Sequence, residues 1–221
     1  MSRRDRMRQI LWAGVLGMMC SASMASAQAR GTAQPIPERT WAAMQGVSWH
    51  ANLPCPARED LRLLTVPYVD FKGRTRQGEL IVAADVAKDM LDIFADIHAA
   101  GYPIQSMRLV HHFRGDDGFS MAANNTSAFN CRVVAGTSRL SQHALGRAID
   151  INPVQNPFVT GRRTSPSAGV DYDTPSERKR AAKGVITAGD AVVRAFRKRG
   201  WGWGGDWTSM KDYQHFSANG N

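Results

Sequence analysis

The chain has few cysteines and no hydrophobic run long enough to cross a membrane as a helix. Three cysteines in 221 residues exclude a small scaffold held together mainly by disulfide bonds. No segment repeats at a fixed period, which argues against solenoids and propellers. Hydrophobic residues make up 43% of the chain and charged residues 21%, so a globally disordered chain is also excluded. These values are typical of one soluble globular domain with short appendages.

The N-terminus has the three parts of a secretory signal peptide. Residues 1–9 are rich in arginine, and residues 10–20 form an apolar run of about half the length of a transmembrane helix. The segment Ala25–Ala27 then fits a cleavage site with small residues. We therefore expect a signal peptide over residues 1–27 and export by the general route to the periplasm, the extracellular space or the cell wall. The same pattern predicts no stable insertion into the membrane.

The sequence carries an excess of positive charge, +9 at pH 7. Removal of residues 1–27 would take away four arginines and one aspartate and would leave a formal charge of +6. A basic exported protein is attracted to polyanions such as cell-wall polymers or anionic lipid, although a moderate charge also serves solubility alone. The basic residues are not interleaved with aromatic residues in a recognition pattern, so we expect no nucleic-acid partner.

Two cysteines, Cys55 and Cys131, remain after removal of the predicted signal peptide, which contains Cys20. In an oxidising compartment such an even pair favours a disulfide between the N-terminal part and the middle of the chain. Two buried free thiols are the alternative. Neither cysteine has the spacing of a zinc ligand.

Hydrophobic periodicity predicts paired strands followed by a helix in the first half of the chain. Residues 28–57 show no sustained period, and we interpret them as an N-terminal linker segment. Frequent β-prone residues over 61–71, a turn signal and an extended pattern over 78–82 predict a β-hairpin or a meander. Apolar residues at helical spacing predict a helix over 83–100.

The second half of the chain predicts shorter elements separated by long loops. We expect a strand over 104–113, a polar loop over 115–137, a strand over 147–151, an irregular stretch over 155–180, a helix over 187–199 and a final strand over 214–217. Mixed helices and strands with hairpin-like connections predict an α+β fold. The expected architecture is a single domain over residues 58–221, with an antiparallel sheet flanked by helices.

Histidines and aspartates in the last third of the chain are of the residue types that bind metal. His143 and Asp150 are seven positions apart and would face opposite sides of a regular strand, but Gly146 offers a bend that lets the two side chains converge. Asp212 and His215 supply another carboxylate and another imidazole. Two imidazoles and a carboxylate are a common zinc ligand set, and a second carboxylate can act as a general base. Taken alone, these residues also fit a hydrogen-bonded core histidine and a surface ion pair.

Three motifs follow one another in this region. They are S-x-H-x-x-G-x-A-x-D over Ser141–Asp150, W-G-W-G-G-D-W over Trp201–Trp207 and D-x-x-H-F over Asp212–Phe216. In their order, spacing and surroundings they resemble the M15 family of zinc peptidases, the D-alanyl-D-alanine carboxypeptidase and L-alanyl-D-glutamate endopeptidase group. The resemblance extends over residues 60–217.

The resemblance implies a role for individual residues. The implied ligands of Zn²⁺, on the face of the sheet, are His143, Asp150 and His215. Asp212 corresponds to the catalytic base. Family members also carry an arginine at the end of a strand before the first histidine, and Arg114 stands there. Arg132 competes for this role, because the residues around Arg114 depart from the family pattern. Such an arginine would hold a substrate carboxylate or stabilise an oxyanion.

The resemblance also implies an activity, that of an exported zinc-dependent metallopeptidase that hydrolyses an amide bond in peptidoglycan stem peptides. Asp212 favours the L-alanyl-D-glutamate endopeptidases, because carboxypeptidases of the family more often have glutamate at this position. A D,D-carboxypeptidase of the same family is the first alternative, and a non-catalytic zinc-containing wall-binding module is the second. We expect the protein to act on stem peptides as a monomer.

Overall fold

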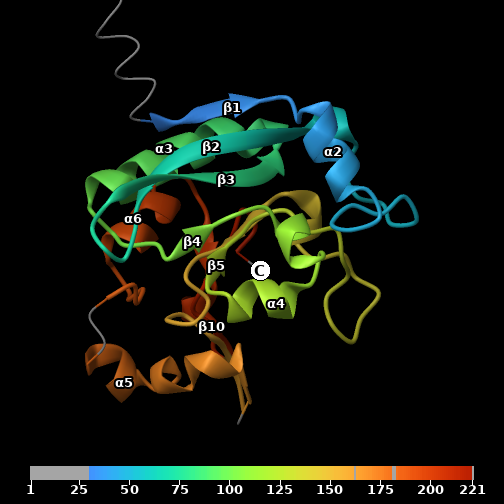
Figure 1. Cartoon of the computed structure of the whole chain (residues 1–221). Coiled ribbons are helices and arrows are strands. Elements are labelled where there is room, and N and C mark those ends of the chain that lie inside the picture. The colour runs from blue at the N-terminus through green and yellow to red at the C-terminus, as the bar shows by residue number, and fades with distance from the viewer. Residues whose placement is uncertain (1–29, 162, 181–182, 221) are drawn as a thin grey trace, which may run out of the picture.

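A computed structural model describes residues 30–161, 163–180 and 183–220. It shows the mixed α+β architecture that the sequence predicts, with small antiparallel sheets and helices in one chain (Figure 1). The predicted signal peptide, residues 1–27, lies outside the described residues. Among the described helices, none combines the length and the apolar character required to span a bilayer.

The predicted β-hairpin is the longest regular feature. Strand β2 (Leu61–Val69) pairs with β3 (Thr75–Ala83) in antiparallel register along its whole length. Asp70 follows β2, and its carboxylate accepts hydrogen bonds from the backbone N–H groups of Lys72 and Arg74 in the connecting turn. This turn fixes the register of the hairpin.

Helix α3 covers the hairpin, and a second helix packs against α3 to complete the main core. Helix α3 (Ala87–Ala99) buries Met90, Ile93, Phe94 and Ile97 at the spacing that predicted it. Helix α6 (Ala191–Arg197) packs against α3. It begins later than the predicted residue 187, because Asp190 caps it by accepting a hydrogen bond from the backbone N–H of Val193.

A second antiparallel sheet lies against the same core. Its order is β6-β11-β9, with β6 at Ala148–Asp150, β11 at His215–Ser217 and β9 at Gly202–Trp203. Phe216 on the central strand is fully buried and stacks on Phe196 of α6. The sheet therefore joins the C-terminal motifs to the main core.

The remaining sheets are short. Strands β7 (Phe158–Thr160), β8 (Arg163–Ser165) and β10 (Lys211–Asp212) form an antiparallel sheet of order β10-β7-β8. Strand β4 (Ser106–Met107) pairs in parallel with β5 (Asn125–Thr126). Helix α5 (Pro175–Arg180) lies at the end of the molecule opposite the β2–β3 hairpin (Figure 1). The 3-10 helices are η1 (Arg58–Asp60), η2 (Ala84–Val86), η3 (Val110–Phe113), η4 (His143–Leu145), η5 (Ser167–Tyr172) and η6 (Gly204–Asp206).

The predicted strand over 104–113 is wrong for most of its length. Only Ser106–Met107 is extended in a ladder, and Val110–Phe113 forms the η3 turn, which ends at Arg114 with a left-handed φ of 61°. The predicted loop over 115–137 contains helix α4 (Asp117–Ala122), capped by the Asp116 carboxylate. The stretch over 155–180 likewise contains the β7–β8 hairpin and α5.

The segment interpreted as a linker, residues 28–57, contributes regular structure from residue 32 onwards. Strand β1 (Thr32–Gln34) pairs with β2, and helix α2 (Glu38–Met44) buries Trp41 and Met44. These side chains pack in a second core cluster that also contains Leu61 and Cys131. A strand of three residues and a helix of two turns are too short to show a sustained period in the sequence.

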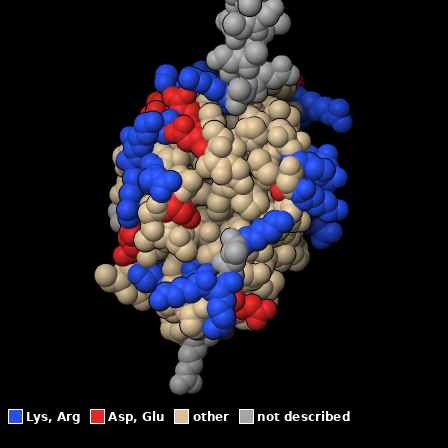
Figure 2. All heavy atoms as spheres, turned by 90° about the vertical axis from the view of Figure 1, so that its left-hand side faces the viewer, with Lys and Arg blue, Asp and Glu red and all other residues tan. Residues whose placement is uncertain are grey.

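Charge is distributed in both signs over the face of the molecule in Figure 2. Lys and Arg side chains surround an area with few charges, and Asp and Glu side chains lie among them. Ion pairs of this kind include Arg199–Asp96 and Lys88–Asp92. The excess of positive charge therefore does not form one uninterrupted basic surface on this face.

Candidate metal centre and its cavity

The sequence around His143 folds into a tight turn before strand β6. His143 begins η4, and Gly146 follows it with a φ of +67°. A Cβ at Gly146 would lie 2.6 Å from the backbone nitrogen of Ala83, which donates a hydrogen bond to the Gly146 carbonyl. Only glycine fits this left-handed, close-packed position. The bend that the sequence analysis placed at Gly146 is therefore present.

Strand pairing brings the second and third residues of the group together. In the β6–β11 register Asp150 lies directly opposite His215. The Nδ1 atom of His215 is 3.0 Å from Oδ1 of Asp150, and Nε2 of His143 is 3.2 Å from Oδ2 of the same carboxylate. His143 Nε2 and His215 Nδ1 are themselves 3.2 Å apart. All three side chains are buried.

The other nitrogen of His143 has a separate partner. Nδ1 of His143 donates a hydrogen bond of 2.7 Å to the carbonyl oxygen of Ala128. Since the neutral imidazole then carries its proton on Nδ1, its lone pair on Nε2 points to the cluster. The backbone N–H of His143 donates to Oγ of Ser141, so Ser141 supports the turn rather than the cluster itself.

The donor set fits a metal ion. One ligand atom from each of His143, Asp150 and His215 lies within 4.8 Å of the others. Burial alone would raise the pKa of Asp150, but the two imidazoles beside it hold this pKa below its usual range. A buried carboxylate facing two imidazole nitrogens is the ligand set of many zinc sites, and the bond from His143 to Ala128 is the usual outer partner of a metal-binding histidine.

Asp212 lies next to the cluster on β10, where it pairs with Phe158 of β7. Its Oδ1 atom is shielded from solvent and has no hydrogen-bond partner among the described residues. Burial raises the pKa of Asp212 to about 7, against the opposing effect of His215. A carboxyl with a pKa near neutrality can both take up and release a proton at physiological pH.

The cluster opens into a cavity of about 780 Å³. The 132–141 segment, β7 and β8, and the C-terminal segment contribute to its walls. Trp207 lines the cavity and lies 5.6 Å from the His215 ring, between ring centroids, whereas Trp201 and Trp203 are buried in the core. The lining residues that carry polar or aromatic groups near the cluster include Asp117, Arg132, Arg139, Phe158, Trp207, Asp212 and Gln214.

The structure distinguishes the two candidate arginines. Arg114 is exposed at the end of η3 and is not among the residues that line the cavity. Arg132 lines the cavity, and its Nη2 atom pairs with Oδ2 of Asp117 at 2.7 Å. The side chain predicted first therefore lies outside the cavity, and the competing one lies on its wall. The cause is that Phe113-Arg114 belongs to a turn and not to the end of a strand.

Two further residues of the motifs do not belong to the cluster. Asp206, the aspartate of the W-G-W-G-G-D-W motif, pairs with Arg197 at 2.6 Å near the surface. Gln214, which the motifs do not single out, is buried beside His215, and its Nε2 lies 3.5 Å from Sδ of Met121. Its position inside the D-x-x-H motif was the only signal in the sequence that pointed to it.

Comparison with known proteins agrees with the motifs. Residues 135–218 match the model of an M15 peptidase family described as D-alanyl-D-alanine carboxypeptidase. No curated protein and no solved structure gives a significant match. The matched segment contains all three cluster residues and Asp212, and it leaves out Arg132 and both disulfide cysteines. The match, together with the buried His-Asp-His cluster, supports an M15 family peptidase.

Proposed function

We propose that the protein is an exported zinc-dependent peptidase that hydrolyses an amide bond in peptidoglycan stem peptides. The observation that carries the proposal is the buried cluster of His143, Asp150 and His215 inside the segment that matches the peptidase family. The cavity of about 780 Å³ beside the cluster is large enough for several residues of a peptide substrate.

The three cluster residues would hold the metal, and Asp212 would move the proton. A Zn²⁺ ion at this site would supply Lewis acidity toward a carbonyl oxygen and would acidify water. The Asp212 carboxylate takes a proton from the attacking water and returns it to the leaving amine. Ala128 keeps the His143 ring in the tautomer that leaves Nε2 free to bind the metal.

Arg132 is the arginine that we assign to the substrate. Its guanidinium lies on the cavity wall, and its Nε is buried without a hydrogen-bond partner among the described residues. A planar, permanently charged group at this place can bind a substrate carboxylate or the developing oxyanion. This assignment replaces Arg114.

Two candidate activities differ in the bond that would be cleaved. Asp212 in place of glutamate favours an L-alanyl-D-glutamate endopeptidase, as argued from the motif. The description of the matched family model favours a D,D-carboxypeptidase. A wall-binding module without catalysis is the remaining alternative, and the buried carboxyl of Asp212 beside the cluster argues against it, because binding alone does not require a general base.

The experiment that tests the proposal uses protein expressed from the full sequence and purified after export. It is incubated with stem peptides of defined sequence, and the products are identified by mass spectrometry. Loss of one terminal D-alanine indicates the carboxypeptidase, and scission after L-alanine indicates the endopeptidase. Intact peptides after incubation with the zinc-loaded protein would contradict the proposed activity. Recovery of the uncleaved precursor from the cytoplasm alone would contradict export.

A further inference from the structure

The segment Ser127–Arg132 contacts the metal centre at several points. The backbone N–H of Ser127 donates to the Asp150 carbonyl, and the N–H of Asp150 donates back to Ser127, at 3.0 and 2.9 Å. The carbonyl of Ala128 accepts the Nδ1 hydrogen bond of His143. One short stretch of chain thus supports two of the three cluster residues.

The same segment continues to the cavity wall. The N–H of Asn130 donates to the His143 carbonyl at 3.2 Å, and the Arg132 carbonyl accepts from the N–H of Ser141 at 3.1 Å. The side chain of Arg132 then lines the cavity. Residues 127–142 belong to no described helix or strand, and one isolated bridge among the described residues, between Ser127 and Asp150, joins them to another part of the chain. Their position therefore depends on individual contacts and not on a ladder of paired strands.

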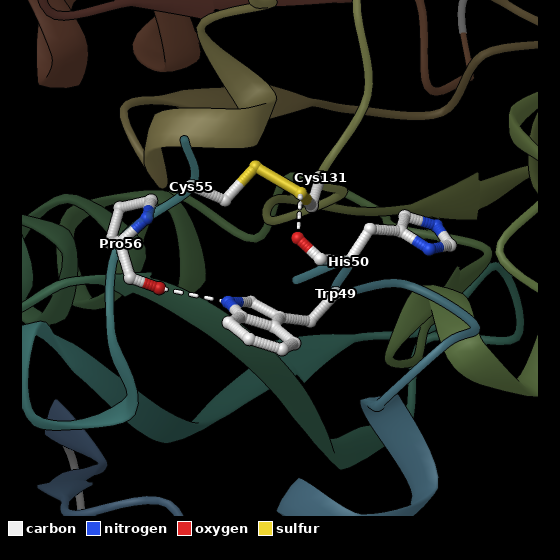
Figure 3. The surroundings of a disulfide bond; sticks show 5 residues. All are labelled: Trp49, His50, Cys55, Pro56 and Cys131. Atoms are coloured by element: carbon white, nitrogen blue, oxygen red, sulfur yellow. Dashed lines mark hydrogen bonds between the residues drawn. A yellow bond between two sulfur atoms is a disulfide. The ribbon is translucent and has the colours of Figure 1, made fainter. Parts of the chain in front are cut away.

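A disulfide anchors this segment one residue before Arg132. Cys131 is bonded to Cys55, with the two Cα atoms 6.0 Å apart, as the sequence favoured. Figure 3 shows the anchor: Sγ of Cys131 lies 3.9 Å from the His50 carbonyl oxygen, and the indole N–H of Trp49 donates to the Pro56 carbonyl across the same loop. The N–H of Cys131 also donates to the Ser48 carbonyl at 2.9 Å.

We propose that the Cys55–Cys131 disulfide is a positioning element of the active site. It fixes the 127–132 segment, and through it the guanidinium of Arg132. The inference rests on the proposed peptidase activity, and Cys131 acts on the substrate only through Arg132. Protein with reduced cysteines keeps its fold, because the main core contains only Ala128 of this segment and neither cysteine, but binds substrate less well.

The geometry also makes activity sensitive to redox conditions. Cys55 is partly exposed and lines an open hollow of about 550 Å³ together with Pro54 and Pro56, so a small reductant reaches it. A phosphine breaks the S–S bond, two thiols form with protons from water, and the phosphine becomes its oxide with the water oxygen. In a compartment that keeps thiols reduced, the site would remain poorly ordered until the protein leaves it.

The first test measures hydrogen exchange in the exported protein, with and without phosphine treatment. Reduction should speed exchange at the amides of Phe129, Asn130 and Cys131 by about tenfold or more, because the segment that carries them loses its covalent anchor. Amides of the β2–β3 ladder, such as Leu64, should not change. Unaltered protection of residues 127–132 after complete reduction would overturn the inference. This result does not depend on peptidase activity, so it stands even if no stem peptide is cleaved.

The second test is a double-mutant cycle on kcat/KM. Replacing both Cys55 and Cys131 with alanine should lower kcat/KM about tenfold, mainly through KM, because a displaced Arg132 no longer meets the substrate. In an Arg132→Ala background the same replacement should cost less than about twofold. Equal losses in both backgrounds would show that the disulfide does not act through Arg132. Ile36→Ala, in the same core cluster, is the matched control: it should lower stability and leave kcat/KM unchanged.

Discussion

At the scale of single residues, the two nitrogens of His143 perform different tasks. Nδ1 donates to Ala128 while Nε2 faces Asp150 and His215. His143→Ala should therefore abolish zinc binding, because it removes one ligand and leaves an open cluster. Metal analysis of the purified variant checks this. His50→Ala, whose ring lies outside the cavity lining, is the control and should retain the metal. A zinc content in His143→Ala equal to that of the unmodified protein would contradict the ligand assignment.

A substitution at Asp212 should distinguish metal binding from proton transfer. Asp212→Asn keeps the shape of the side chain but cannot take up a proton. We expect it to bind zinc normally and to lose about 10²- to 10⁴-fold in kcat, the usual contribution of a general base. Parallel measurement of bound zinc and of stem-peptide turnover checks both statements. Turnover close to that of the unmodified enzyme would remove Asp212 from the mechanism.

The two arginines provide a matched comparison. Arg132→Met should raise KM for stem peptides by about tenfold or more, because it removes a charged hydrogen-bond donor from the cavity wall. Arg114→Met, at an exposed position outside the lining, should leave KM within about twofold. Steady-state kinetics on both variants decides the assignment, and the opposite order of effects would return the role to Arg114.

The sequence pattern grouped the three residues that the structure brings together, whereas Arg114, the arginine it favoured, lies outside the cavity lining. The motifs contain all three cluster residues, His143, Asp150 and His215. Only a bend at Gly146 and the pairing of β6 with β11 are needed to bring these residues together. The pattern favours Arg114 because it predicts a strand that ends next to this residue. The short apolar run of η3 fits a strand and a helical turn equally well, so periodicity cannot separate the two. Arg132 is positioned by a disulfide and by contacts distant in sequence, which no local pattern contains.

At the scale of elements, the long ones were predictable, and so were the short strands β6 and β11 in the motif regions, but other short elements were not. The β2–β3 hairpin and α3 present enough residues to show a period. Strand β1 and helix α4 have three and six residues, which is too few for a period to emerge. Such elements are stabilised mainly by the surfaces on which they pack.

The turn of the β2–β3 hairpin contains a pH-sensitive element. Hydrogen bonds from the Arg74 and Lys72 backbone, and from the side chains of Arg74 and Arg76, hold the pKa of Asp70 well below its usual value of 3.8, against the effect of desolvation. A lowered folded-state pKa stabilises the fold above pH 3.8, and this stabilisation is lost as the pH falls further toward the folded-state value.

Asp70→Asn tests this element. The variant should be less stable than the unmodified protein at pH 7, and the difference should shrink at pH 3, where the unfolded chain already binds the proton. Denaturant unfolding of the metal-free proteins at both pH values measures this difference in the free energy of unfolding. Asp171→Asn, at an exposed position, is the control and should have little effect at either pH. A destabilisation by Asp70→Asn that is as large at pH 3 as at pH 7 would contradict the account.

At the scale of the whole molecule, the N-terminal third and the family-like C-terminal segment form one structure. The family match begins at residue 135, yet the His143, Asp150 and His215 cluster is supported by residues 127–132, and these are anchored by the disulfide to residue 55. The β2–β3 sheet and α3 share a core with the β6-β11-β9 sheet. The peptidase-like segment therefore depends for its geometry on residues that precede the matched region.

The most direct test of the account is a zinc titration of stem-peptide cleavage by the chelated protein. We predict that chelation abolishes cleavage, that activity returns in proportion to added zinc up to about one ion per chain, and that Asp212→Asn binds the same zinc without cleaving. Cleavage that persists after chelation, or zinc bound at this ratio with every stem peptide left intact, would contradict a catalytic metal at His143, Asp150 and His215.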